Sequence, residues 1–206
     1  MKTLIKHFIE NNPKEVLEKS LFDCHVKGLH SIMLLDSPGK TIRLYLTDKD
    51  HELNPFMNRV INVGYHPHHC DLTFKIVTGQ LVNIIAEESN DLDFDFEIDK
   101  YLYKSKISKG KMRFDHIGKV DMKIINKKYL IKGDELFMRA DEIHTVSVEK
   151  NKVCAWLVFE GKKDPKYIPY CYSTTNLNYQ SGENLYTKPE YINQIIELLN
   201  KNNLIK

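Results

Sequence analysis

The sequence predicts an all-β protein, an antiparallel sandwich or barrel, with a helical segment at each end. About ten short apolar or alternating runs follow one another at the spacing of 8–12 residues that such folds show. Glycines separate these runs, and helical periodicity is confined to the two ends of the chain. The 206 residues suit one domain, 1–206, divided into a helical segment (1–25), a barrel (28–162) and a loop with a C-terminal helix (163–206).

The N-terminal segment carries helix signals from residue 12 onward. Asn12 offers an N-cap, Pro13 suits the first turn, and Glu15 stands where a capping box needs a carboxylate. Apolar residues then follow at helical spacing: Val16, Leu17 and Leu21. We expect this helix to cover a sheet.

The strands of the barrel are predicted from apolar runs and from alternation with a period of two. Their expected ranges are 31–35, 41–47, 59–63, 72–77, 81–86, 92–98, 120–125, 136–138, 144–148 and 153–159. The range 92–98 has the most regular alternation, with apolar residues at every second position and acidic residues between them.

Residues 163–206 are expected to form a turn-rich loop followed by a helix. Five tyrosines lie between residues 165 and 187, so this loop is either a lid or a packed connector. A capping box at 187–190 then precedes one apolar stripe: Ile192, Ile195, Ile196 and Leu199.

Composition excludes several classes of function. The chain has 30 basic and 28 acidic residues, and nearly all of the basic ones are Lys, which argues against a nucleic-acid surface. No apolar run is long enough for a transmembrane helix, and the N-terminus does not resemble a signal peptide, so we expect a cytoplasmic protein without membrane contact. The four cysteines show no CxxC spacing and are expected to be free thiols.

A histidine-rich segment at residues 64–79 concentrates the candidate chemistry. On a strand, His66 and His68 share one face, while Tyr65, His69 and Asp71 share the other. Two imidazoles on an inward face can supply two ligands of a metal site, and a neighbouring strand must supply the third. The candidate for that ligand is His144, which begins a later predicted strand.

These two segments together resemble the two motifs of the cupin family. In the first, His66 and His68 are followed by three residues, Leu72, six residues and Gly79. In the second, Gly133 and His144 have the family's separation. Three positions of this second motif differ from the family: Arg139, Asp141 and Val148.

The resemblance implies a cupin double-stranded β-helix with flanking N-terminal and C-terminal helices, and a homodimer formed through strand edges. Because Leu72 stands at the position of the usual carboxylate ligand, it also implies a three-histidine metal site of His66, His68 and His144. Cupins with such sites act with O2 on small molecules. The implied function is oxidation of a small polar molecule by a non-haem iron enzyme, with Fe(II) preferred over Zn, Ni, Mn or Cu.

Part of the chain is similar to cysteine dioxygenase, a three-histidine cupin. Arg43 lies on an upstream strand, where that family places an Arg that grips the substrate carboxylate. Arg139 is a second candidate for an anion contact, and Tyr65 or a tyrosine of the loop could donate a hydrogen bond to substrate. The family's Ser, His and Tyr on the later strand are replaced by Ala155, Leu157 and Phe159.

Two alternatives remain open at this point. His69, Asp71 and His144 are similar to the HxD…H site of 2-oxoglutarate oxygenases, which requires His69 and Asp71 on the inner face. A non-catalytic cupin that binds a small ligand or a partner protein is the other alternative, since the barrel is shared by many functions.

Overall fold

The structure is a computed structural model of the chain. It describes residues 2–22, 24, 26–51, 64–90, 92–108, 111–163, 166–168, 170–174, 180–181, 184–185 and 191–205. The expected strand at 59–63 and the expected capping box at 187–190 lie outside these residues.

The first of two antiparallel sheets has seven described strands in the order β13-β1-β2-β3-β10-β4-β8. Their bounds are β1 (Leu21–Phe22), β2 (Leu29–Ser37), β3 (Lys40–Thr47), β4 (Cys70–Thr78), β8 (Glu135–Met138), β10 (Ala155–Lys163) and β13 (Asn184–Leu185). The central strands alternate between buried and less buried residues, because apolar residues at every second position share one face.

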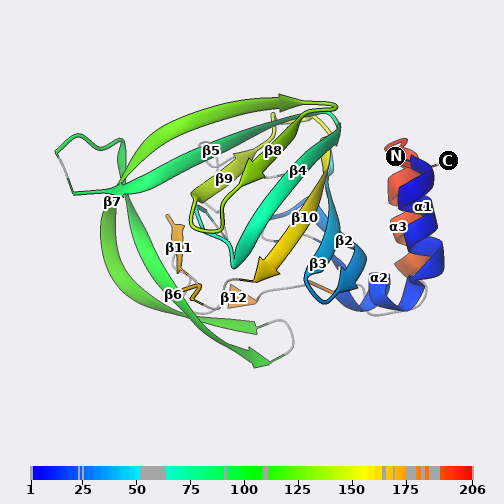
Figure 1. Ribbon diagram of the computed structural model, residues 1–206, viewed down its shortest axis with the longest axis horizontal. Helices are drawn as coiled ribbons and strands as arrows, with labels where there is room; N and C mark the ends of the chain where they lie inside the picture. Colours follow the sequence, from blue (N-terminus) through cyan, green and yellow to red (C-terminus); the bar gives the residue numbers. More distant parts are fainter. Residues whose placement is uncertain are drawn as a thin grey trace.

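The second sheet has six described strands, with the order β11-β6-β7-β5-β9 and β12 paired to β7. Their bounds are β5 (Gln80–Ser89), β6 (Phe96–Ser108), β7 (Lys111–Ile131), β9 (Ile143–Ser147), β11 (Tyr170–Ser173) and β12 (Gln180–Ser181). The long β6–β7 hairpin curves around one side of the molecule (Figure 1).

From β7 to β11, successive strands alternate between the two sheets. β8 and β10 belong to the first sheet, whereas β9 and β11 belong to the second. This path is that of a double-stranded β-helix. Apolar side chains from both sheets fill the space between them, among them Leu72, Leu81, Leu130 and Trp156. The predicted all-β fold is therefore confirmed.

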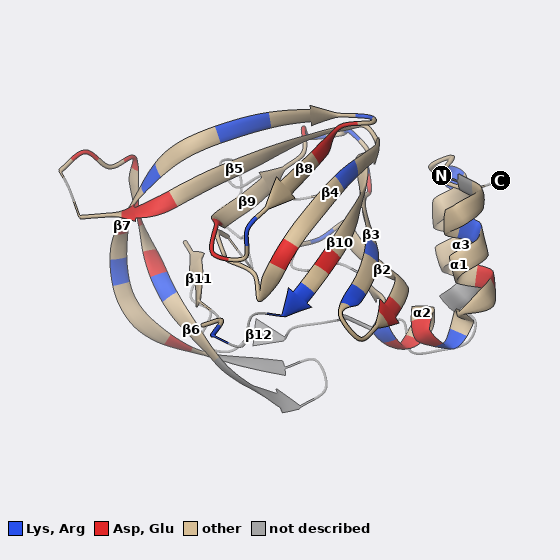
Figure 2. Ribbon diagram, viewed as in Figure 1, with Lys and Arg blue, Asp and Glu red and all other residues tan. Residues whose placement is uncertain are grey.

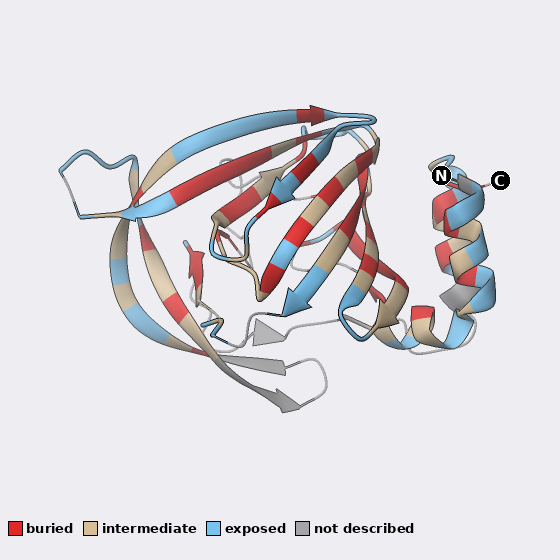
Figure 3. Cartoon of the chain, viewed as in Figure 1, coloured by how far each residue is buried: buried red, intermediate tan, exposed pale blue. Residues whose placement is uncertain are grey.

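Three helices cover the outer face of the first sheet: α1 (Lys2–Asn11), α2 (Pro13–Lys19) and α3 (Tyr191–Lys201). Ile5 of α1 and Leu199 of α3 belong to one buried cluster with Leu44 of β3 and Leu157 of β10. Buried and exposed positions alternate along the helices (Figure 3), and α2 has one buried residue, Val16. The expected flanking helices are thus both present, and both cover a sheet.

The start of α2 differs from the expectation. Asn12 precedes the helix, but its side chain makes no cap hydrogen bond and instead donates to the carbonyl oxygen of Phe8 in α1 (3.2 Å). The Asn12 side chain thus acts as a donor to the preceding helix and not as an acceptor for the N–H groups of α2. Leu21, expected on the same helix, lies in β1, because α2 ends at Lys19.

The strand predicted at 92–98 begins only at Phe96, and Leu92 and Phe94 are exposed. The acidic residues of this stretch bind β7 instead of facing solvent from a strand. Asp93 forms an ion pair with Lys123, and a carboxylate oxygen of Asp95 accepts the backbone N–H of Ile124 (2.6 Å). Alternation alone does not distinguish this loop from a strand.

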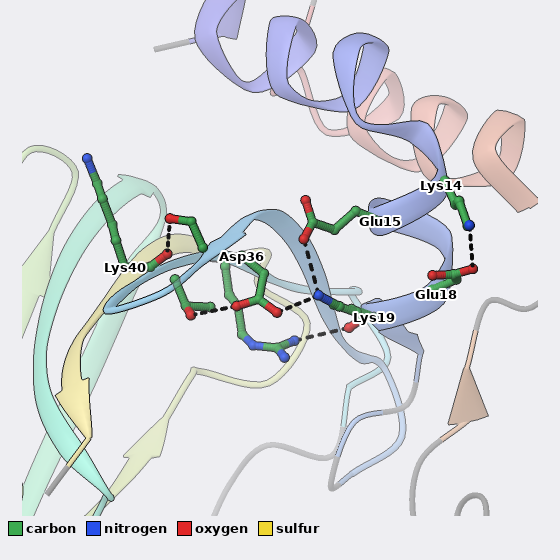
Figure 4. A network of polar contacts seen from close by, with 9 residues as sticks. Lys14, Glu15, Glu18, Lys19, Asp36 and Lys40 are labelled. Carbon is green, nitrogen blue, oxygen red and sulfur yellow. Dashed lines mark hydrogen bonds and ion pairs between the residues drawn. The ribbon is translucent and has the colours of Figure 1, made fainter.

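A polar network fixes α2 against the sheet (Figure 4). Lys19 Nζ lies 3.1 Å from Glu15 Oε1 and 2.5 Å from Asp36 Oδ2 on β2. The carbonyl oxygen of Lys19 accepts a hydrogen bond from Arg43 Nη1 on β3 (3.2 Å). The Lys19 ammonium holds the pKa of Asp36 below its ordinary value. Arg43 itself lies on the inner face of β3 with Tyr45, because Ile42 and Leu44 on either side of it pack against the helices.

Acidic and basic side chains are interspersed over both sheets (Figure 2). Several pair across neighbouring strands, such as Lys75 with Glu135 and Lys119 with Glu97. Among the described residues, no helix has both the length and the apolar character that crossing a membrane would require.

Candidate metal centre

The segment before β4 is held against two other parts of the chain. Gly64 packs so closely on β11 that a Cβ atom there would lie 2.3 Å from the carbonyl oxygen of Tyr172. His66 and His144 exchange backbone hydrogen bonds of 3.0 and 3.1 Å, and the N–H of His68 donates to the carbonyl of Ala140 (2.9 Å). His66 and His68 are therefore fixed beside the start of β9.

Three imidazole rings converge at this place. The ring centroids of His66, His68 and His144 lie between 4.7 and 5.3 Å apart. One nitrogen from each ring lies within 4.8 Å of the others, and the Nε2 atoms of His68 and His144 are 2.7 Å apart. The structure thus brings together the three histidines that the sequence singled out.

The Nδ1 atoms of His144 and His66 each form a hydrogen bond, and these bonds orient the Nε2 atoms of the two rings. His144 Nδ1 lies 2.7 Å from Asn83 Oδ1, an acceptor on β5. His66 Nδ1 lies 3.2 Å from the carbonyl oxygen of Gly64. Because each acceptor requires a proton on Nδ1, the Nε2 atom of each ring carries a lone pair, as a metal ligand must.

Burial favours the neutral form of these rings. Desolvation lowers the pKa of His66 below its ordinary value. Desolvation, and then the neighbouring charge of His66, lower the pKa of His144 further. Neutral imidazoles are the form that binds metal, and three of them suit Fe, Zn, Ni or Cu better than Mg or Ca. The donor set therefore fits a transition metal.

A cavity of about 110 Å³ adjoins the three rings. Tyr45 and Trp156 stack on one another in its wall, with centroids 5.5 Å apart and planes inclined by 10°. Other lining residues are mostly apolar, including Val26, Leu29, Leu72, Phe74, Val146 and Val158. A ligand in this cavity would lie beside the histidines in mostly apolar surroundings.

A wider cleft of about 1270 Å³ adjoins this cavity. His69 and Glu160 line both the cleft and the cavity. We expected His69 to face away from His66 and His68, and this is wrong. The prediction assumed one continuous strand, but β4 begins at Cys70 and the chain bends at His69, so strand alternation does not apply there.

Donor atoms of His69, Cys70 and Glu160 form a second group within 4.8 Å of one another. Asp71 does not join either group. Its side chain is exposed and accepts the backbone N–H of Ala140 (2.8 Å). The structure therefore does not assemble the HxD…H arrangement of His69, Asp71 and His144.

The three residues expected to assist catalysis lie in different surroundings. Arg43 lines the cleft, where its Nε lies 3.4 Å from Glu160 Oε1. Arg139 lies on an exposed turn and pairs through two nitrogens with Asp141 (3.1 and 2.8 Å), so the structure does not bring it to the cavity.

Tyr65 packs in a different apolar cluster, against Phe96, and does not line the cavity. Burial raises the pKa of Tyr65 to about 12, and its hydroxyl has no hydrogen-bond partner among the described residues. Tyr172, its partner in the backbone pairing, belongs to the same apolar cluster.

Two residues of the site were missed in the sequence, although each carries a signal. Glu160 shares a strand face with Trp156 and Val158, at a spacing of two, which predicts that it faces inward. Asn83 is a polar residue in the middle of an apolar strand, and such a residue needs a hydrogen-bond partner when buried.

No family model and no curated protein matches the sequence. The chain is similar to a number of solved structures, including the following three. A cupin superfamily protein from Desulfitobacterium hafniense is 16% identical over 66% of this chain and 78% of its own, with a TM-score of 0.37. The polyketide cyclase RemF from Streptomyces resistomycificus is 12% identical over 74% and 78%, with a TM-score of 0.37. Hydroxypropylphosphonic acid epoxidase from S. wedmorenis is 9% identical over 69% and 55%, with a TM-score of 0.40. A function for this chain must therefore be argued from its own site.

Proposed function

We propose that the protein is a metal-dependent enzyme that oxidises a small organic molecule with O2 at a three-histidine iron centre. One observation carries the proposal: His66, His68 and His144 direct ring nitrogens within 4.8 Å of one another at the edge of a cavity. A ligand in that cavity would lie beside the metal, against a mostly apolar wall.

In this proposal His66, His68 and His144 hold the ion as neutral ligands. Bound Fe(II) would supply a Lewis acid and a one-electron redox centre with positions not taken by protein. Asn83 positions His144 by accepting from its Nδ1. The stacked Tyr45 and Trp156 form a rigid wall that limits the size of the substrate.

Arg43 is the charged group best placed to bind a polar end of the substrate. It lines the cleft with His66 and His68, and its position is fixed by hydrogen bonds to Ser31 and Lys19. A guanidinium held in this way suits a carboxylate. Tyr65 and Arg139 receive no role, because neither lines the cavity or the cleft.

A non-catalytic protein that binds a small molecule is the second candidate. Leu72 favours it, because this buried side chain lies in the cavity wall at the position where the resemblance to cupins leads one to expect a carboxylate ligand. Such a protein would bind its ligand in the same cavity and consume no O2.

Metal analysis of untagged protein, purified without chelator or metal-affinity resin, tests the proposal. We expect near-stoichiometric iron after anaerobic reconstitution, and O2 uptake with a subset of small carboxylates, thiols or diketones. His144→Ala should lose the iron and keep its circular dichroism spectrum. His116→Ala, a surface histidine paired with Asp99, is the matched control and should retain the iron. Failure of the wild type to take up iron would contradict the enzyme proposal and favour the ligand-binding alternative.

A further inference from the structure

A second group of metal-binding side chains lies next to the three histidines and shares none of their donor atoms. It consists of His69, Cys70 and Glu160, whose donor atoms lie within 4.8 Å of one another. We propose that these three residues form a second metal site, separate from the three-histidine centre, for a thiolate-binding dication such as Zn²⁺.

The imidazole of His69 has a free nitrogen in this group. Its Nε2 is buried and has no hydrogen-bond partner among the described residues. Glu160 Oε2 lies 3.8 Å away, which is too far for a hydrogen bond. A buried polar atom without a partner is unfavourable, and a cation between these two atoms would satisfy both.

Glu160 can serve as a ligand through one oxygen while the other stays paired. Its Oε1 faces Arg43 Nε at 3.4 Å, and its Oε2 faces His69. Arg43 is itself held by Ser31 Oγ and the carbonyl oxygen of Lys19, each at 3.2 Å. The guanidinium therefore orients the carboxylate, as outer groups commonly do for metal ligands, without occupying the coordinating oxygen.

Cys70 brings the third donor to the group from the first residue of β4. Its side chain is 1% exposed, and the backbone N–H of Gly161 contacts its sulfur. The pairing of β4 with β10 is irregular between Glu160 and Lys163, which marks a bulge beside the site. This irregularity turns the N–H of Gly161 toward Cys70 at the point where Glu160 enters the cleft.

The spacing and charge of the group suit a dication. Metal–ligand distances of about 2.0–2.3 Å place tetrahedral donors roughly 3.4–3.8 Å apart, so side-chain adjustments of about an ångström complete the site. Cys70 as a thiolate and Glu160 as a carboxylate would balance two positive charges. Thiolate and imidazole favour Zn over Mg or Ca. A fourth position would open toward the cleft that His69 and Glu160 line.

Cobalt(II) titration of the metal-free full-length chain tests the proposal, because a cobalt–thiolate bond has a charge-transfer absorption in the near ultraviolet. We expect two cobalt ions per chain, one of them accompanied by this absorption, and loss of the absorption when Zn²⁺ is added. Cys70→Ser should lose the absorption and one cobalt ion. Glu160→Gln should weaken the same site by at least about tenfold.

His144→Ala separates this proposal from the function proposed above. It should lose the other cobalt ion and keep the thiolate absorption. Cys154→Ser is the matched control, because Cys154 is an equally buried thiol outside the group, and it should keep the absorption. Circular dichroism checks that each variant is folded.

Three results would overturn the second site: no thiolate absorption in the wild type, absorption that persists in Cys70→Ser, or absorption lost in His144→Ala. The last would mean that one ion is shared by both groups. The wild type could also bind a single cobalt ion that shows the thiolate absorption. This result would support the second site and contradict the three-histidine centre.

Discussion

His144 Nδ1 lies 2.7 Å from Asn83 Oδ1, and this hydrogen bond determines which nitrogen of His144 faces the other two histidines. His144 pairs with Ile85 across β9 and β5, so Asn83 is its diagonal neighbour on the same face of the sheet. Both side chains are buried. The sheet therefore holds the proposed metal ligand His144 and its hydrogen-bond partner in one register.

Removing the acceptor of Asn83 should weaken metal binding. We expect Asn83→Leu to lower the affinity of the three-histidine centre by about 10–100-fold, the usual effect of losing an outer hydrogen bond to a ligand. Competition with a fluorescent chelator measures this affinity. Asn83→Asp keeps an acceptor for Nδ1 and should keep most of the affinity. Equal affinity in Asn83→Leu and the wild type would show that the bond does not orient His144.

Metal should stabilise the fold, because the three ligands are together only in the native state. At a free Fe(II) concentration about 100 times the Kd, anaerobic addition should add about 2.7 kcal/mol to the free energy of unfolding. For a domain of this size the Tm would rise by roughly 5–10 °C. Differential scanning calorimetry checks this, and a chelator should reverse it. In His66→Ala the rise should be absent; the same rise there would place the iron elsewhere.

Gly64 should be intolerant of a side chain, because its Cα faces the carbonyl oxygen of Tyr172. A Cβ there would lie 2.3 Å from that oxygen, so Gly64→Ala must displace the segment that carries His66. Metal affinity should fall at least about tenfold, since ligands need placement within about 0.5 Å.

Gly39→Ala is the control for this substitution. Gly39 has φ of +75° and no atom near its missing Cβ, so the variant should lose about 1–2 kcal/mol of stability through backbone strain alone. Its metal affinity should not change. Unchanged affinity in Gly64→Ala as well would mean that the segment adjusts without moving the histidines.

The ion pair of Asp36 with Lys19 should stabilise the protein only above the acidic range. The pKa of Asp36 is lowered in the folded protein, so the unfolded chain binds its proton more readily, and the contribution is complete above the ordinary value of 3.8. It is lost as pH falls through the lowered pKa. The Asp36 side chain is 35% exposed, so screening limits the effect to about 0.5 kcal/mol.

Urea unfolding of Asp36→Asn and of the wild type at a series of pH values measures this effect. The two free energies of unfolding should differ at pH 7 and converge below 3.8. A difference that stays constant down to acidic pH would assign the effect to packing and not to charge.

The sequence predicted the fold where one periodicity continued without interruption. β3, β4 and β5 have alternating or apolar patterns with few exceptions, and each lies within a few residues of its expected range. β7 spans Lys111–Ile131, far beyond the expected 120–125, because its outer residues mix charged and apolar side chains without regular alternation and are ordered by pairing with β5 and β6. Such pairing is not visible in one strand's own sequence.

The sequence predicted those residues of the candidate site that are recognised by their spacing along the chain. His66, His68 and His144 were found from their motifs, and the structure brings them together. The position of His69 could not be predicted, because it depends on where β4 begins. Glu160 could have been found by counting from Trp156 along one strand face.

The helical layer on the first sheet has a consequence for how the protein folds. Ile5 near the start of the described chain and Leu199 near its end belong to the same buried cluster. Closing so long a loop costs little more free energy than closing one half as long, about 0.6 kcal/mol per doubling. The long separation in sequence delays the formation of this cluster, however, because contacts between distant residues form slowly. During synthesis the apolar outer face of β3 and β10 is therefore covered completely only after α3, the last described helix, has been made.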